Sequence, residues 1–130
     1  MIKNLTPPQA WKFIQEHPEA LLIDVRTRME FAFVGHPAGA VHIPWKEFPD
    51  WQVNAQFVEN VRQVAADTDT ALLLLCRSGQ RSLDAARMLE QAGYSQLINI
   101  QEGFEGDLDA DKHRGTSGGW RFHDLPWQQS

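Results

Sequence analysis

The sequence predicts an α/β domain with a central, mainly parallel sheet flanked by helices on both faces and followed by an irregular C-terminal tail. Short apolar runs alternate with segments of helical periodicity up to about residue 100, a pattern typical of βαβ units. The run Ala71–Leu75 is apolar at every position and too short for a helix, as expected for a central strand covered on both faces. We therefore expect a single domain over residues 1–130, with a core at about 6–100 and a tail at about 102–130.

The first expected elements are a helix, a strand, a short helix and a second strand. In TPPQAWKFIQEHP, Thr6 can cap the helix, Pro7 suits its first turn and Gln9 completes a capping box. LLIDV reads as a buried strand, TRMEFAFVG as a short helix that closes near its glycine, and GAVHIP as a strand that its proline ends. These three segments occupy residues 21–25, 27–35 and 39–44.

The second half of the sequence predicts two more helices, one before and one after the apolar run. The segment 54–67 should begin at a cap on Asn54 and cover one face of the sheet with an apolar stripe. That stripe consists of Phe57, Val58, Val61, Val64 and Ala65. The segment 80–93 should end near Gly93, and QLINI at residues 96–100 should form a further strand. The buried face expected for this last helix consists of Ala85, Met88, Leu89 and Ala92.

Composition narrows the classes of function. The formal net charge of -5 argues against a nucleic-acid-binding or anionic-membrane surface, because both partners select basic proteins. The one cysteine cannot form an internal disulfide, and the first residues lack the features of a signal peptide, so we expect a cytoplasmic protein. The five histidines show no spacing that indicates a metal site, so we expect no metal.

The cysteine is the strongest candidate for chemistry. Cys76 ends the apolar run, and the next helix begins at about residues 80–82, so the thiol should lie at the carboxyl end of a central strand. Loop N–H groups and the unpaired N–H groups of the first helical turn favour an anion at this position. Arg77 and Arg81 add two charges if their side chains turn toward the sulfur. The loop therefore favours a nucleophilic thiolate.

Three motifs in order resemble those of the single-domain rhodaneses, which are persulfide-forming sulfurtransferases. LLIDVRTRMEF is similar to the first signature of that family, GHPAGAVHIP to its second, and CRSGQRS to its active-site loop. The resemblance extends from about Thr6 to Ile100 and implies a rhodanese-like fold. The ending GGWRFHDLPWQ is similar to the tails of some bacterial members, which suggests that Trp120 and Trp127 pack back on the domain.

The resemblance implies a two-step reaction. Cys76 would take the outer sulfur from a donor such as thiosulfate, carry it as a covalent persulfide without any other cofactor, and pass it to cyanide, a thiol or a sulfur-relay protein. Asp24, Arg26 and Glu30 would support the site, and for the first two we favour a bracing network over a direct catalytic part. The loop that would bind substrate and persulfide consists of Arg77, Ser78, Gly79, Gln80, Arg81 and Ser82.

Three alternatives stay open at this stage. A cysteine phosphatase or arsenate reductase would place an arginine six positions after the nucleophile, where this chain has Ser82. A non-catalytic rhodanese module that binds a partner protein generally lacks the loop cysteine, which this chain keeps. A cysteine-protease dyad with a distant histidine is compatible with the sequence, although no local signature of such an enzyme is present.

One motif in the tail has a competing interpretation. The run DLDADKHRGTSG spaces Asp107, Asp109 and Asp111 like the first ligands of a calcium loop. Lys112 then replaces the required glycine, and Gly118 occupies the place of the bidentate glutamate. We therefore interpret this run as a solvated acidic loop.

Overall fold

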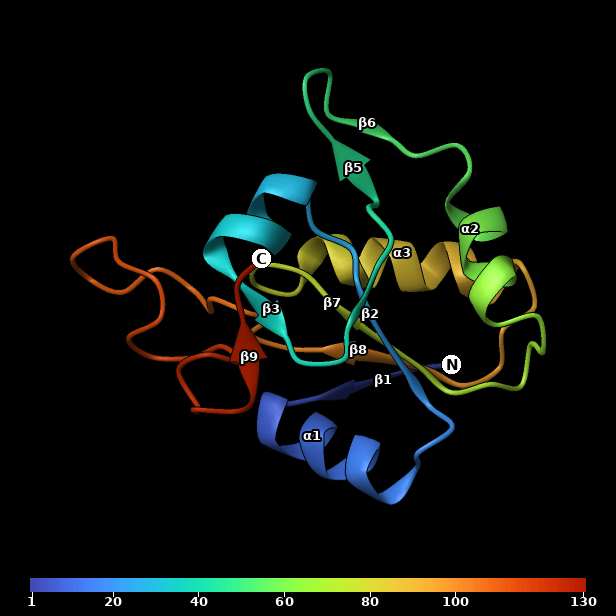
Figure 1. Cartoon of the computed structure of the whole chain (residues 1–130), viewed down its shortest axis with the longest axis horizontal. Helices are drawn as coiled ribbons and strands as arrows, with labels where there is room; N and C mark the ends of the chain where they lie inside the picture. Colours follow the sequence, from blue (N-terminus) through green and yellow to red (C-terminus); the bar gives the residue numbers. More distant parts are fainter.

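The computed structural model describes residues 1–130, and its centre is a five-stranded, all-parallel sheet (Figure 1). The apolar run of four leucines is a central strand, as the sequence predicts, because strands with both faces covered have no polar side. In spatial order the strands are β1 (Ile2–Leu5), β8 (Leu97–Ile100), β7 (Leu72–Leu75), β2 (Leu21–Asp24) and β4 (Val41–His42).

Helices cover both faces of this sheet. In Figure 1, α1 lies on one side of the strands, and α2 and α3 lie on the other. Side chains of β7 alternate between the two sides: Leu72 and Leu74 join the core under α2 and α3, whereas Leu73 and Leu75 join the core under α1. The helices span Pro7–Glu16 (α1), Phe57–Val64 (α2) and Gln80–Gln91 (α3).

The start of α1 confirms the predicted capping box. The backbone N–H of Gln9 donates to the Thr6 hydroxyl at 3.4 Å, and the Thr6 N–H donates to the Gln9 side chain at 3.0 Å. The predicted cap of α2 is wrong, because the helix begins later, after Gln56. The side chain of Asn54 instead accepts from the Gln56 N–H at 2.9 Å and closes the turn that precedes the helix.

On the face of the sheet opposite α1, the buried sides of α2 and α3 differ slightly from those that the sequence predicts. Val64 of α2 is 46% exposed and Met88 of α3 is 39% exposed, although the sequence pattern assigned both to the core. In α3 the sheet is contacted by Ser82, Ala85, Ala86 and Leu89, which follow the spacing i, i+3, i+4 and i+7. A serine and two alanines permit close approach of the helix to the sheet.

Smaller elements surround this core. The edge strand β1 has no counterpart in the sequence prediction, because a four-residue edge strand with polar residues at positions 3 and 4 gives no clear pattern. The short helix after β2 is η1, a π-helical turn that ends at a glycine, as the sequence predicts. The remaining strands are β3 (His36–Pro37), β5 (Lys46–Glu47), β6 (Gln52–Val53) and β9 (Trp127–Gln128), and η1 spans Glu30–Val34. β5 and β6 form a hairpin that projects from the domain (Figure 1).

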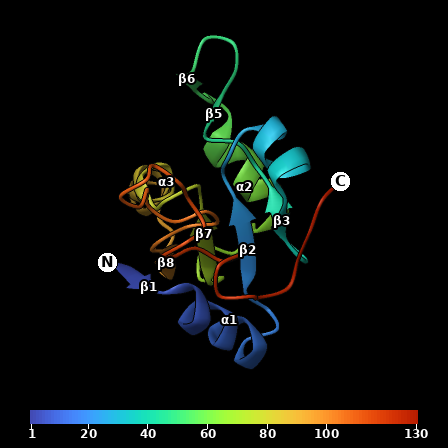
Figure 2. The ribbon, with the colours of Figure 1, turned by 90° about the vertical axis from the view of Figure 1, so that its left-hand side faces the viewer.

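The C-terminal tail wraps over the α1 face of the sheet. Trp120 is fully buried and packs edge-on against Trp11, with ring centroids 6.0 Å apart, as predicted for a tail that packs back. Trp127 is partly packed, at 37% exposed, and its strand β9 pairs with β3. Figure 2 shows this red segment running past the α1 side to end beside β3. None of the helices combines the length and apolar character that a membrane crossing requires.

Candidate active site

Cys76 follows β7 directly and lies at the carboxyl edge of the sheet. Its side chain is almost fully buried, and its Sγ accepts a hydrogen bond from the backbone N–H of Gly79 at 3.1 Å. Gly79 has a φ of 115°, a backbone conformation that a residue with a Cβ rarely adopts. The next residue begins α3, so the unpaired N–H groups of its first turn add positive potential on the same side. The loop is therefore arranged for a sulfur anion.

A polar network lies behind the sulfur. The Ser82 hydroxyl is 3.2 Å from Cys76 Sγ and donates to Asn99 Oδ1 at 2.6 Å, and Asn99 Nδ2 donates to Asn4 Oδ1 at 3.0 Å. The hydroxyl carries one proton but faces the sulfur, the Asn99 amide oxygen and the Gly79 carbonyl. It can stabilise the thiolate only by turning its proton from one of these oxygens to the sulfur.

Arg81 and Glu30 form a bidentate ion pair beside the cysteine. The two guanidinium nitrogens of Arg81 donate to the two carboxylate oxygens of Glu30 at 2.8 and 2.9 Å. The backbone N–H and hydroxyl of Thr27 donate to the same carboxylate at 3.2 and 2.9 Å. The guanidinium carbon also lies 5.2 Å from the ring centroid of Trp51. These contacts direct the positive charge of Arg81 at a carboxylate.

The pairing changes the proton affinity of both groups. Burial by itself would raise the pKa of Glu30, but the hydrogen bonds and charge of Arg81, with further hydrogen bonds from Thr27, lower that pKa from 4.5 to about 2. Burial by itself would lower the pKa of Arg81, yet the hydrogen bonds and charge of Glu30 raise that pKa above its ordinary value, with smaller contributions from Cys76 and Asp24. The pair is ionised throughout the physiological pH range.

A cavity of about 470 Å³ opens at the cysteine. One wall is apolar and comes from Met29 and the β5–β6 hairpin, which contributes Phe48 and Trp51. The rest of the lining is polar or charged and comes from Thr27, η1, the cysteine loop with the start of α3, and the tail, and no histidine takes part. The lining residues are Thr27, Met29, Glu30, Phe48, Trp51, Cys76, Arg77, Ser78, Gln80, Arg81, Glu105 and Arg114.

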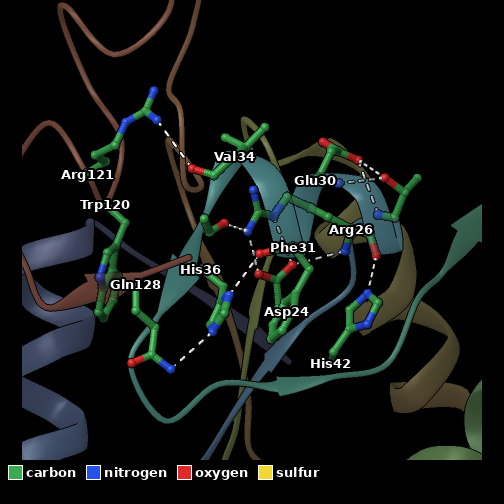
Figure 3. A network of polar contacts seen from close by, with 12 residues as sticks. Asp24, Arg26, Glu30, Phe31, Val34, His36, His42, Trp120, Arg121 and Gln128 are labelled. Carbon is green, nitrogen blue, oxygen red and sulfur yellow. Dashed lines mark hydrogen bonds and ion pairs between the residues drawn. The ribbon is translucent and has the colours of Figure 1, made fainter. Parts of the chain in front are cut away.

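Asp24 and Arg26 form a second ion pair (Figure 3). Neither side chain lines the cavity. Both side chains are fully buried, and Arg26 donates to Asp24 through Nε at 2.9 Å and Nη2 at 2.7 Å. Nη2 also donates to the Gly35 carbonyl, and the guanidinium carbon lies 4.5 Å from the Phe104 ring centroid. His42 hydrogen-bonds to the Arg26 carbonyl at 2.7 Å. The pair joins β2, the turn after η1 and the tail.

The structure divides the residues that the sequence singles out into three groups. The side chains that line the cavity are Cys76, Arg77, Ser78, Gln80, Arg81 and Glu30. Gly79 and Ser82 lie behind the sulfur, and Asp24 and Arg26 lie in the sealed network.

Sequence reasoning missed seven residues of the site. Asn99 interrupts the otherwise apolar strand LINI, which is a readable signal for a buried polar contact. The others come from the segment between β2 and η1, from the β5–β6 hairpin and from the tail, whose positions depend on tertiary structure. The seven are Thr27, Met29, Phe48, Trp51, Asn99, Glu105 and Arg114.

Comparisons with known proteins match the sequence and the fold of this chain. The Rhodanese-like domain family model matches residues 6–110. An uncharacterized protein of Rickettsia conorii is 37% identical over 98% of both chains. The thiosulfate sulfurtransferase GlpE of Haemophilus influenzae is 35% identical over 80% of this chain and 86% of its own. The crystal structure of Rv0390 from M. tuberculosis matches 98% of both chains with a TM-score of 0.88 and 38% identity.

Proposed function

Because the chain belongs to the rhodanese-like family, we propose that it is a sulfurtransferase that carries sulfane sulfur as a persulfide on Cys76. The observation that carries the proposal is the setting of the sulfur: Sγ accepts the Gly79 N–H in a loop before a helix and borders an open cavity. The name of the Haemophilus influenzae relative, thiosulfate sulfurtransferase, supports the same reaction class.

In the first step the Cys76 thiolate attacks the outer sulfur of thiosulfate. A bond forms between Sγ and that sulfur, the sulfur–sulfur bond of thiosulfate breaks, and its electron pair leaves with sulfite. One thiolate and one dianion give one persulfide anion and one sulfite dianion, so no oxidant or reductant is required. The Gly79 N–H, the Ser82 hydroxyl and the N-terminus of α3 can stabilise the negative charge of both thiolate and persulfide.

In the second step an acceptor removes the outer sulfur. Cyanide or a thiolate attacks the terminal persulfide sulfur, the sulfur–sulfur bond breaks, and its electron pair returns to Cys76 as thiolate. The products are thiocyanate or a new persulfide. The apolar side chains of Met29, Phe48 and Trp51 can pack against the carbon skeleton of an organic thiol, either free or presented by a sulfur-relay protein.

The rival chemistries find less support in the site. A phosphatase of this kind places its clamping guanidinium six positions after the cysteine, where this chain has Ser82, and both terminal nitrogens of the neighbouring Arg81 are held by Glu30. A cysteine protease requires a histidine base, and none lines the cavity. Para-nitrophenyl phosphate should therefore be hydrolysed no faster by the wild type than by a Cys76→Ser variant. Cysteine-dependent hydrolysis at an enzymatic rate would revive the phosphatase alternative.

The proposal is tested by thiocyanate formation from thiosulfate and cyanide. The Cys76→Ser variant should keep the fold, because serine is close to cysteine in size, and should form no thiocyanate above the uncatalysed rate. Circular dichroism of the variant provides the control for folding. Thiocyanate production by the serine variant at the wild-type rate would refute Cys76 as the sulfur carrier.

A further inference from the structure

We infer that the C-terminal tail completes the active site, with Arg114 and Arg77 forming an anion-binding subsite for the sulfur donor. The inference rests on the proposed sulfurtransferase function and goes beyond it by naming the recognition residues and the class of donor. That donor carries an anionic group next to its sulfane sulfur. The sulfonate part of thiosulfate and the carboxylate of a small organic persulfide share this chemistry.

The tail is attached to the cysteine loop by direct backbone contacts. The N–H groups of Glu105 and Gly106 donate to the Arg77 carbonyl at 3.0 and 3.2 Å, and that of Phe104 donates to the Cys76 carbonyl at 2.8 Å. A Cβ on Gly103 would clash with the Cys76 carbonyl oxygen and the Arg77 backbone, so the two segments touch where only glycine fits. The tail is therefore a fixed wall of the site.

Arg114 is held in this wall by its own contacts. Its Nη1 donates to the Gly106 carbonyl at 2.7 Å, and the N–H of Gly115 donates to the Glu105 carbonyl at 2.7 Å. The loop before it is closed by Asp109, whose carboxylate accepts from the backbone of Asp111 and His113 at 2.8 and 2.9 Å and from the Thr116 hydroxyl. The run that resembled a calcium loop thus uses its carboxylate to fold the segment that carries Arg114.

The charges around the cavity show why Arg114 matters. Three guanidiniums and two carboxylates line the cavity, and one of each is consumed in the Arg81–Glu30 pair. Neither Arg77 nor Arg114 forms an ion pair within the chain, and Glu105 is the opposing carboxylate. The lining therefore has one net positive charge, which a Cys76 thiolate cancels. Without Arg114, a dianionic donor would approach a net negative cavity in a protein that is already acidic.

The test compares two protein variants that each lack one cation, and it includes two organic donors that differ by one carboxylate. Arg114→Gln removes the cation, and Lys112→Gln removes a neighbouring exposed cation that does not line the cavity. The donors are thiosulfate, the persulfide of N-acetylcysteine and the persulfide of N-acetylcysteine amide, which lacks the carboxylate. Steady-state kinetics are measured for each combination at low and high salt, together with thermal unfolding of each variant.

We expect Arg114→Gln to lower kcat/KM about five- to hundredfold for thiosulfate and for the N-acetylcysteine donor, mainly through a raised KM. The amide donor should change less than about twofold, and Lys112→Gln should match the wild type with every donor. Arg114→Lys should restore most of the loss, because the charge returns. Loss with thiosulfate alone would restrict the subsite to that source. Equal losses with charged and amide donors, or no loss, would overturn the inference.

A binding measurement separates this inference from the proposed function. Calorimetry with the Cys76→Ser protein measures thiosulfate binding without any sulfur transfer. The affinity should fall at least fivefold when Arg114→Gln is added, and should be unchanged when Lys112→Gln is added. If the wild type transferred no sulfur but this difference held, the proposed function would fail and the subsite would stand. Equal affinities in all three proteins would refute the subsite.

Discussion

Two arginine–carboxylate ion pairs, Asp24–Arg26 and Glu30–Arg81, differ in their exposure to solvent and in their distance in the structure from the reactive cysteine's cavity. The side chains of Asp24 and Arg26 are fully buried, and Arg26 donates to the Asp24 carboxylate and to the Gly35 carbonyl. The nitrogen–oxygen distances in the Glu30–Arg81 pair are similar, but the Glu30 side chain is 18% exposed, the Arg81 side chain is 13% exposed, and both line the cavity at Cys76. Asp24 is the last residue of β2, and Glu30 is the first residue of η1.

The difference lies in what surrounds each pair. Both side chains of the Asp24–Arg26 pair are fully buried, so removal of one partner leaves a buried charge unpaired, and the main effect of this pair is on folding. The pair in the cavity faces solvent and the reacting sulfur, so its main effect is on the electric field that an incoming anion meets. We therefore expect the two pairs to respond differently to matched substitutions.

The largest effect should follow from opening the sealed pair. Arg26→Met would keep much of the side-chain volume but leave the Asp24 carboxylate buried without its cation. We expect a loss of about 3 to 5 kcal/mol in the free energy of unfolding, measured by urea denaturation. The matched change Glu30→Gln in the cavity should cost clearly less. A stability of Arg26→Met equal to the wild type would contradict the assignment of this pair to folding.

Removing the cation and removing the carboxylate of the cavity pair should change the KM for thiosulfate in different directions. Arg81→Gln leaves the Glu30 carboxylate unpaired in the cavity and should raise the KM for thiosulfate, by about threefold or more. Glu30→Gln frees a guanidinium and should lower that KM or leave it unchanged. The control is the change Asp84→Asn, which removes an exposed carboxylate of α3 outside the cavity. Equal rises in KM for both cavity variants would show that loop geometry, and not charge, is what the pair provides.

A smaller effect concerns the pH dependence of the cavity pair. The pKa of Glu30 is lowered from 4.5 to about 2 by Arg81, so its contribution to stability is complete above pH 4.5 and disappears as the pH falls toward 2. The difference in unfolding free energy between the wild type and Glu30→Gln should therefore shrink over this interval. Urea denaturation at several pH values measures this difference. A constant difference from pH 6 to pH 2.5 would contradict the lowered pKa.

Contiguous features of this chain could be predicted from its sequence. The capping box at Thr6, the apolar strand before Cys76 and the glycine that ends α3 each depend on residues close together in the chain. The cysteine loop was predictable for the same reason, because its nucleophile, glycine and helix start lie within five residues.

Features that depend on packing could not be predicted in the same way. The face that each helix turns toward the sheet depends on packing, and Val64 of α2 and Met88 of α3 are partly exposed. In α3 the buried face consists of Ser82, Ala85, Ala86 and Leu89. Arg81 looked like a free cation until the fold placed Glu30, 51 residues earlier, against it. Arg114 came from a tail without periodicity, and only the contacts of that tail with the Arg77 carbonyl place it at the cavity.

The central claim is that Cys76 carries sulfur, and intact mass spectrometry tests it most directly. The reduced protein is measured before and after incubation with thiosulfate, and again after cyanide, with Cys76→Ser as the matched control. We predict a gain of one sulfur atom by the wild type, its loss on addition of cyanide, and no gain by the variant. A wild-type mass that thiosulfate leaves unchanged, or an equal gain by the serine variant, would contradict the account.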